Sequence, residues 1–204
     1  MDAVIFCNGD LCKFNIINGF VDLNKSIVIG VDGGCNYLLS NNIKINIAIG
    51  DFDSINNEEV LKNLSNIRKT NLDYSDLEMA IEYCINEKYS KVYLFGCTGK
   101  RADHFIFNFR LMEKLYNNNI ETYMIDDYNV MTLFCGYKHF YKNKYKFFSI
   151  IPLYENTRIS IEGSKYDLNN KKLNLQSSLT LSNEWINEII TLNSNKLVCI
   201  CLVF

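Results

Sequence analysis

The first 125 residues alternate strand-length apolar runs with stretches of helical periodicity, and this alternation constrains the fold more than any other feature. The runs are rich in Val, Ile, Phe and Tyr, as β-strands are. They cover residues 3–7, 26–31, 45–49, 91–95 and 121–125. Because strands that alternate with helices usually pair in parallel, the sequence predicts a doubly wound, mainly parallel α/β sheet.

Two helices stand out between these runs. In 75–87 apolar residues recur at i, i+3, i+4, i+7 and i+8, and Ser75 with Glu78 three residues later forms a capping box. A second helix is predicted over 101–116, with an apolar stripe made by Phe105, Phe109, Met112 and Tyr116.

After Asp127 the pattern changes to short, often alternating apolar segments separated by Asn, Gly and Lys turns, with no helix-length period. The predicted strands are 130–134, 146–153, 158–162, 173–175, 179–182, 188–192 and 197–204. This pattern indicates a smaller antiparallel β-sandwich or barrel. We therefore expect two domains, an α/β domain over 1–127 and an all-β domain over 128–204.

Composition narrows the functional classes. The chain of 204 residues is 48% hydrophobic with a net charge of −2, which excludes disorder and argues against nucleic acid as the main partner. No apolar run approaches the roughly 20 residues of a membrane span, and no secretory signal opens the chain. The eight cysteines form no C-x-x-C pair, which favours buried reduced thiols and a cytoplasmic protein.

Acidic residues follow several predicted strands directly. Asp32 ends the run 26–31, and Asp51 with Asp53 follows the run 45–49. The carboxyl ends of parallel strands meet at one edge of a sheet, where open α/β sheets bind ligands. Carboxylates gathered there repel one another unless a cation lies among them.

Further polar groups belong to the same predicted edge. Asp73 and Asp76 flank the capped helix start, and the turn after 91–95 carries Thr98, Gly99, Lys100, Arg101, Asp103 and His104. Oxygen-only ligands favour a hard cation, with Mg²⁺ the default, and such ions usually bind substrate phosphates as well. Basic side chains and backbone amides are suitable phosphate donors.

Each segment alone also has a purely structural interpretation. Asp73 and Ser75 are ordinary helix-capping residues, Asp32-Gly33-Gly34 is a common turn, and Lys100-Arg101 is a typical solvated pair. The convergence of four segments on one sheet edge favours a phosphate and metal site. The chain has no G-x-x-x-x-G-K-[ST] loop, no G-x-G-x-x-G after the first strand, and no G-x-S-x-G elbow.

The combined motifs resemble the thiamine pyrophosphokinase (thiamine diphosphokinase) family. The matching segments are Asp32-Gly33-Gly34, Gly50-Asp51-Phe52-Asp53-Ser54, Asp73-Tyr74-Ser75-Asp76, the run from Gly96 to His104, and Ser182-Asn183-Glu184-Trp185. They are weak singly and specific together, and they spread over nearly the whole chain in the family's order.

The resemblance implies the Mg²⁺-dependent transfer of the pyrophosphoryl group of ATP to the thiamine hydroxyl, giving thiamine diphosphate and AMP. It implies metal ligands at Asp51, Asp53 and Asp76. Catalytic roles fall to these three with Asp73 and Arg101. ATP-binding residues are implied at Asp32, Gly33, Ser75, Thr98, Gly99, Lys100, Arg101, Asp103 and His104. Thiamine contacts are implied at Ser182, Asn183 and Trp185, near the interface of a homodimer.

Two departures from the family pattern stand out. Leu72 occupies a position where Lys is common, and Lys100 replaces a frequent Gly. The alternatives are a related pyrophosphokinase acting on another alcohol, such as a hydroxymethylpterin, and a non-catalytic thiamine- or nucleotide-binding module. Trp185, the single Trp, is interpreted equally well as a core residue or as an aromatic face for the thiazolium cation.

Overall fold

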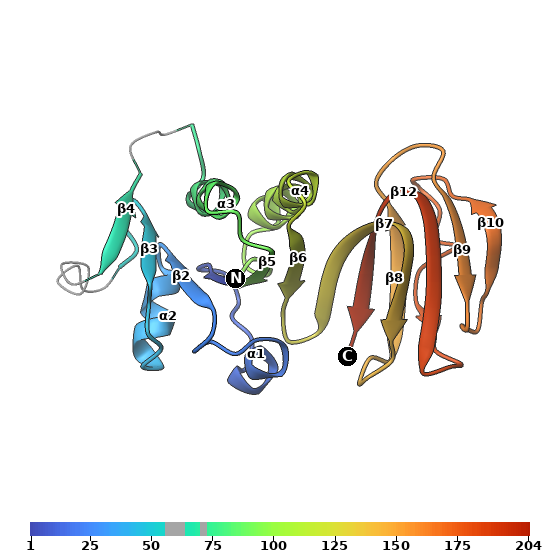
Figure 1. The fold of residues 1–204 in the computed structure, drawn as a ribbon, viewed down its shortest axis with the longest axis horizontal. Helices are drawn as coiled ribbons and strands as arrows, with labels where there is room; N and C mark the ends of the chain where they lie inside the picture. Colours follow the sequence, from blue (N-terminus) through green and yellow to red (C-terminus); the bar gives the residue numbers. More distant parts are fainter. Residues whose placement is uncertain (56–63, 70–72) are drawn as a thin grey trace. The chain divides into compact units, whose positions relative to one another are not determined.

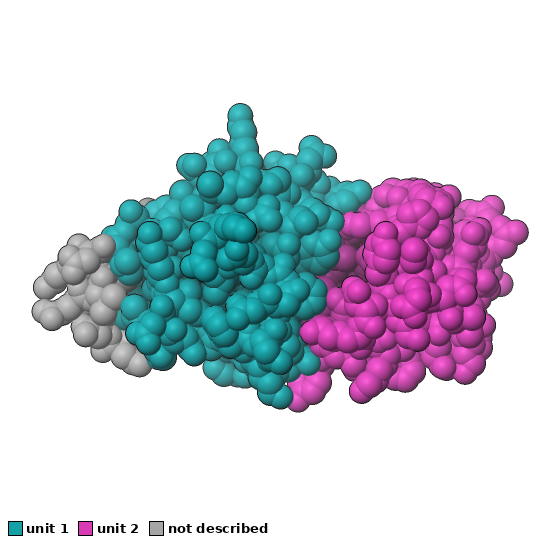
Figure 2. Space-filling view, turned by 60° about the horizontal axis from the view of Figure 1, so that its bottom comes forward, with its two compact units in different colours: residues 1–127 teal, residues 128–204 magenta. Residues whose placement is uncertain are grey.

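The protein divides into two compact units, Met1–Asp127 and Tyr128–Phe204, coloured separately in Figure 2. The computed structural model describes residues 1–55, 64–69 and 73–204. Within these ranges, no helix combines the length and apolarity needed to cross a lipid bilayer.

Unit 1 is built on a parallel sheet in the order β6-β5-β1-β2-β3-β4. Its strands are β1 (Asp2–Phe6), β2 (Ile27–Val31), β3 (Ile47–Gly50), β4 (Ser65–Arg68), β5 (Lys91–Phe95) and β6 (Glu121–Ile125). The prediction of a mainly parallel α/β sheet is confirmed. The sequence missed only β4 among these strands, because its four residues are all exposed and lack an apolar run.

Helices cover both faces of this sheet, as Figure 1 shows, with α3 and α4 on one face and α1 and α2 on the other. The helices are α1 (Phe14–Phe20), α2 (Gly34–Ser40), α3 (Asp76–Asn86) and α4 (Ala102–Asn117). The predicted helix start at Ser75 is confirmed, because its side chain accepts a hydrogen bond of 3.1 Å from the backbone N–H of Glu78. This cap fixes where Asp76 enters the helix.

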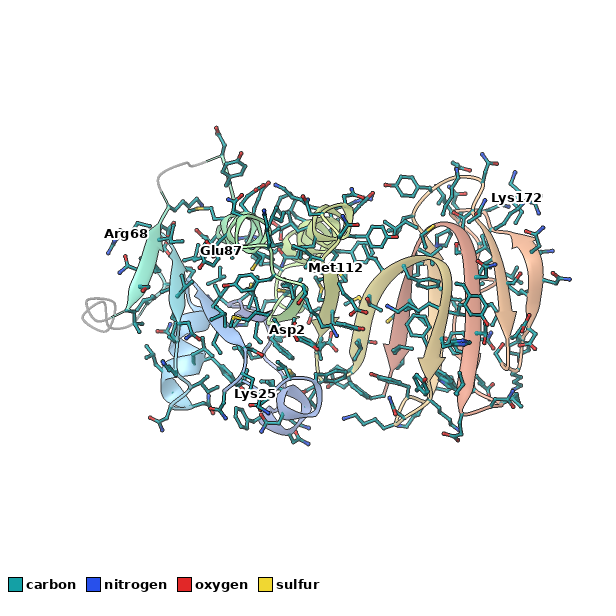
Figure 3. The ribbon with its side chains drawn as sticks, in the orientation of Figure 1. Asp2, Lys25, Arg68, Glu87, Met112 and Lys172 are labelled. Atoms are coloured by element: carbon teal, nitrogen blue, oxygen red, sulfur yellow. The ribbon has the colours of Figure 1, made fainter. Side chains whose placement is uncertain are left out.

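The predicted apolar stripe of α4 is confirmed at Met112 and wrong at its other three positions. The buried residues are Asn108, Leu111, Met112 and Leu115, whereas Phe105, Phe109 and Tyr116 are only half-buried. The reason is that Asn108 faces inward and donates a hydrogen bond to the carbonyl of Cys97 (3.0 Å), which satisfies a buried polar group. Met112, labelled in Figure 3, is fully buried.

Unit 2 is an antiparallel β structure centred on two long strands. Its strands are β7 (Asn129–Tyr141), β8 (Phe147–Pro152), β9 (Arg158–Glu162), β10 (Leu168–Lys172), β11 (Asn183–Glu184) and β12 (Ile189–Val203). β12 pairs with β7 along its length, while its first half also pairs with β9 and its second half with β8. Exchanging partners along one strand lets the two halves of unit 2 share a core.

Several predicted strands of unit 2 are corrected. The segments 188–192 and 197–204 form one strand, β12, with a register shift between Ser194 and Val198. Segments 173–175 and 179–182 are not strands, because they are interrupted by turns that Ser177 N–H closes to Asn174 O and Leu181 N–H closes to Ser178 O. Alternating leucines there mimic a strand pattern.

Candidate active site

The site lies at the topological switch point of the sheet of unit 1, next to strands β1 and β5. The chain moves outward from β1 through β2 and β3 to β4 and then returns to place β5 on the other side of β1. The loops after β1 and β5 therefore lead to helices on opposite faces of the sheet, and the carboxyl edge at this point is where open α/β sheets bind ligands.

These two loops are tied together by their backbones. Cys7 N–H donates to Phe95 O (2.8 Å), Gly9 N–H to Gly96 O (2.8 Å) and Asp10 N–H to Thr98 O (3.0 Å). A Cβ on Gly9 would overlap the carbonyl of Gly96, so glycine is required for this approach. The Lys100 ammonium adds a hydrogen bond to the carbonyl of Asn8 (3.1 Å).

A pocket of about 570 Å³ opens at this edge, a volume suited to a small-molecule substrate. Nine of the predicted residues line it: Asp32, Ser75, Asp76, Thr98, Gly99, Lys100, Arg101, Asp103 and His104. The loop that carries Asp51 and Asp53 contributes Ser54 to the wall. Gly33, at the N-terminus of α2, instead packs against the Asn8 side chain, and Asp73 is exposed just before the cap of α3.

Three carboxylates come together beside the pocket. Asp32, Asp51 and Asp53 each place an oxygen within 4.8 Å of the others. The loop holds its own shape, since Asp51 accepts a hydrogen bond from the Asp53 N–H (3.1 Å) and Asp53 accepts one from the Ser54 hydroxyl (2.9 Å). Asp32 Oδ1 is buried without a hydrogen-bond partner, which is unfavourable for a carboxylate unless a cation satisfies it. This donor set fits a hard divalent cation.

Asp76 is a metal ligand by the resemblance, but it lies outside the cluster of three carboxylates. Its Oδ1 lies 3.6 Å from the ammonium of Lys69, a side chain only 13% exposed, and it is not one of the three clustered carboxylates. Burial raises the pKa of Asp76, the Lys69 charge lowers it, and the charges of Asp51 and Asp32 raise it further. Asp76 therefore lies within electrostatic reach of the cluster, with Lys69 as its present counter-charge.

The Arg101 side chain, at the start of α4, is held in place by an exposed ion pair with Asp103. The Arg101 guanidinium donates from Nε to Asp103 Oδ1 (3.2 Å) and from Nη2 to Asp103 Oδ2 (2.6 Å). This guanidinium lowers the pKa of Asp103 to about 2, so the pair is ionised at neutral pH. Both side chains are about two-thirds exposed, which leaves the guanidinium accessible to an anion.

Two residues of the segment predicted to contact thiamine, Asn183 and Trp185, are buried inside unit 2. The Asn183 side chain donates to Ser164 Oγ (3.1 Å) and Tyr166 O (3.0 Å), and its Oδ1 accepts from the N–H groups of Tyr166 and Glu184. All four hydrogen-bonding positions of this amide are used, so none is left to a ligand. Ser182 is exposed, with its backbone N–H bonded to Ser149 Oγ (2.9 Å).

Trp185 lies in the core of unit 2, 7% exposed and edge-on to Phe148 at 5.1 Å. Replacing Trp185 with Ala is expected to destabilise the protein by roughly 3–5 kcal/mol, because it removes a buried indole. Urea denaturation followed by far-UV circular dichroism measures this. Tyr137→Ala, at an aromatic 65% exposed in β7, is the control and should be nearly neutral. An unchanged midpoint with a raised KM for thiamine would instead favour a substrate contact.

Sequence reasoning missed some residues of the site. Lys69 follows the exposed strand β4, and no pattern indicates that it reaches Asp76. Asn8 and Gly9 line the pocket without forming a familiar phosphate motif. Phe107 also lines the pocket, although its helical position alone suggests a surface residue. Leu72 is outside the described residues.

A doubly wound α/β unit with a pocket of small-molecule size and a carboxylate cluster at its switch point, joined to an antiparallel β unit, is typical of a two-domain enzyme that binds a phosphorylated substrate. Two family models match the chain: "Thiamin pyrophosphokinase, catalytic domain" over residues 22–124 and "Thiamin pyrophosphokinase, vitamin B1 binding domain" over 139–199. The chain belongs to the thiamin pyrophosphokinase family.

Known relatives agree with this assignment. A thiamine pyrophosphokinase from Bacillus subtilis is 32% identical over 91% of this chain and 90% of its own length. The crystal structure of thiamine pyrophosphokinase from Bacillus subtilis superposes with a TM-score of 0.91, at 30% identity and covering 100% of this chain and 99% of the other. That of the Geobacillus thermodenitrificans protein gives 0.86 at 27% identity, covering 100% and 98%.

Proposed function

We propose that the protein transfers the pyrophosphoryl group of ATP to the hydroxyl of thiamine, giving thiamine diphosphate and AMP. The observation that carries the proposal is the pocket of unit 1, which is lined by Asp32 of the carboxylate cluster and by the basic side chains of Lys100, Arg101 and His104. This unit matches the family's catalytic model, and unit 2 matches its vitamin B1 binding model. The second match favours thiamine over a hydroxymethylpterin as the acceptor.

Asp32, Asp51 and Asp53 are the proposed ligands of Mg²⁺, supported by the buried, unpartnered Oδ1 of Asp32. A bound Mg²⁺ would supply neutralisation of the charge on the triphosphate oxygens. Asp76, whose buried Oδ1 also has no hydrogen-bond partner, can add a fourth carboxylate while it stays near Lys69. The proposed set therefore adds Asp32 to the ligands implied by the resemblance.

The chain's own groups provide positioning and charge stabilisation. Arg101, held by Asp103, offers a bidentate donor to phosphate oxygens, and Thr98, Gly99, Lys100 and His104 surround the same end of the pocket. Gly33 and Ser75 set the loop and the cap that place Asp32 and Asp76. Asp73, exposed beside the cap of α3, is proposed to orient the thiamine hydroxyl for attack on the β-phosphorus. Catalysis then rests on orientation and preorganised charge.

For the thiamine end we propose Ser182 as the contact, with Asn183 and Trp185 shaping the segment from within unit 2. A homodimer in which thiamine lies near the subunit interface, and a cytoplasmic location, complete the proposal.

The reaction is tested by incubating the protein with ATP, Mg²⁺ and thiamine and separating the products by chromatography. We expect AMP and thiamine diphosphate in equal amounts, and no turnover in excess EDTA until Mg²⁺ is restored. ADP with thiamine monophosphate would contradict pyrophosphoryl transfer. Full activity in EDTA would contradict the metal site, and ATP binding without products would indicate a non-catalytic module.

A further inference from the structure

Phe107 is a large aromatic side chain that lines the pocket and yet remains 42% exposed. It is not needed for packing α4 on the sheet, because the inward face of α4 is made by Asn108, Leu111, Met112 and Leu115. Leaving an aromatic ring in water is unfavourable, and covering it with another apolar surface recovers that free energy.

Most of the other side chains that line the pocket are polar or charged and suit the phosphate groups of a ligand. The pocket's other apolar side chains in the described part of the chain are almost fully buried: Cys7 7%, Val31 4%, Leu77 5% and Cys97 3% exposed. Phe107 is therefore the one exposed apolar side chain that lines this pocket within the described ranges.

Phe107 lies one helical turn beyond the proposed phosphate-binding groups. His104 and Phe107 are at i and i+3 on α4, so they neighbour each other on one side of the helix, separated by about 4.5 Å along its axis. A ligand whose phosphates meet Arg101 and His104 at the helix start can extend along α4 to reach this ring.

We propose that Phe107 is a specificity-determining residue that stacks on the adenine of ATP. This inference rests on the proposed function, which makes ATP the phosphoryl donor. The base is assigned to adenine and not to the thiamine rings because Phe107 belongs to the unit that matches the catalytic model, while the vitamin B1 binding model matches the other unit. Purine rings stack well on aromatic side chains because both present flat π surfaces.

The test compares the affinity for ATP with that for inorganic tripolyphosphate, which has the phosphates without the base. By titration calorimetry with Mg²⁺ present, Phe107→Ala is expected to weaken ATP binding roughly tenfold and to leave tripolyphosphate binding unchanged. Phe107→Tyr should bind ATP as the wild type does. Ile106→Ala is the matched control, since Ile106 is 62% exposed on the same helix and does not line the pocket.

Unchanged ATP affinity in Phe107→Ala, or an equal loss for both ligands, would overturn the proposal. So would a raised KM for thiamine with an unchanged KM for ATP, which would assign the ring to the other substrate. If Phe107→Ala does not fold, Phe107→Leu replaces it in the same comparison of ATP with tripolyphosphate, because Leu keeps the bulk of the side chain without the ring. A wild type that shows the base-dependent difference but forms no AMP would refute the proposed reaction and leave the stacking role standing.

Discussion

Asp51→Asn is expected to lower turnover with ATP and thiamine by roughly 100-fold or more, since residues that merely support metal ligands already change affinity or activity 10–100-fold. The substitution keeps the shape of the side chain and removes one negative charge from the cluster of Asp32, Asp51 and Asp53. Asp53→Asn and Asp32→Asn are expected to behave alike. Asn is also well tolerated at position 32, where φ is +46°, in the left-handed region.

The same variants should be as stable as the wild type, or more stable, when no divalent cation is present. Carboxylates this close repel one another, so removing one charge relieves the folded state at low ionic strength. Mg²⁺ should raise the melting temperature of the wild type, because a ligand that binds only the folded state stabilises it, and this increase should shrink in each variant. Steady-state assays and thermal melts with and without Mg²⁺ measure both effects.

Asp22→Asn is the matched control, since Asp22 pairs with Lys25 on the surface of the same unit (3.4 Å). It should leave turnover and the effect of Mg²⁺ unchanged. A melting temperature that collapses in Asp51→Asn would show that the cluster is structural. Turnover at the wild-type level in Asp51→Asn would show that Asp51 takes no part in metal binding or catalysis.

The sequence was sufficient for the sheet of unit 1 because its strands β1, β2, β3, β5 and β6 are buried apolar runs bounded by polar residues. Once these runs pair in parallel, the residues that follow them meet at one edge. That is why Asp32, Asp51 and the 96–101 loop were predictable as neighbours.

Other features depend on tertiary contacts that no local pattern encodes. β4 is an exposed edge strand, and Lys69 reaches Asp76 only because β4 pairs with β3. The core face of α4 includes Asn108. The cost of burying its amide is offset by its hydrogen bond to the carbonyl of Cys97, eleven residues earlier in the chain. Residue type alone likewise cannot distinguish a ligand-binding Asn from Asn183, whose amide donates both of its hydrogen bonds to residues distant in sequence, Ser164 and Tyr166.

Arg101→Ala is expected to reduce kcat by roughly 10²–10³-fold, the usual effect of removing one preorganised donor to developing negative charge. Charge moves onto the bridging and β-phosphate oxygens as AMP leaves, and the guanidinium is held ready for it by its two hydrogen bonds to Asp103. Stability should change little, because exposed ion pairs contribute little to the free energy of unfolding. Single-turnover assays and thermal melts separate these two effects.

Conservative variants determine what the arginine does. Arg101→Lys should recover only part of the rate, since an ammonium keeps the charge without the planar, bidentate donor. Asp103→Asn should lower the rate less than Arg101→Ala, because the guanidinium remains but loses its charged partner. Arg110→Ala is the control, at an exposed arginine of α4 that does not line the pocket. Wild-type rates in Arg101→Ala would place the arginine outside the site. Equal losses in Arg101→Ala and Arg110→Ala would show that the effect comes from net charge and not from a contact in the site.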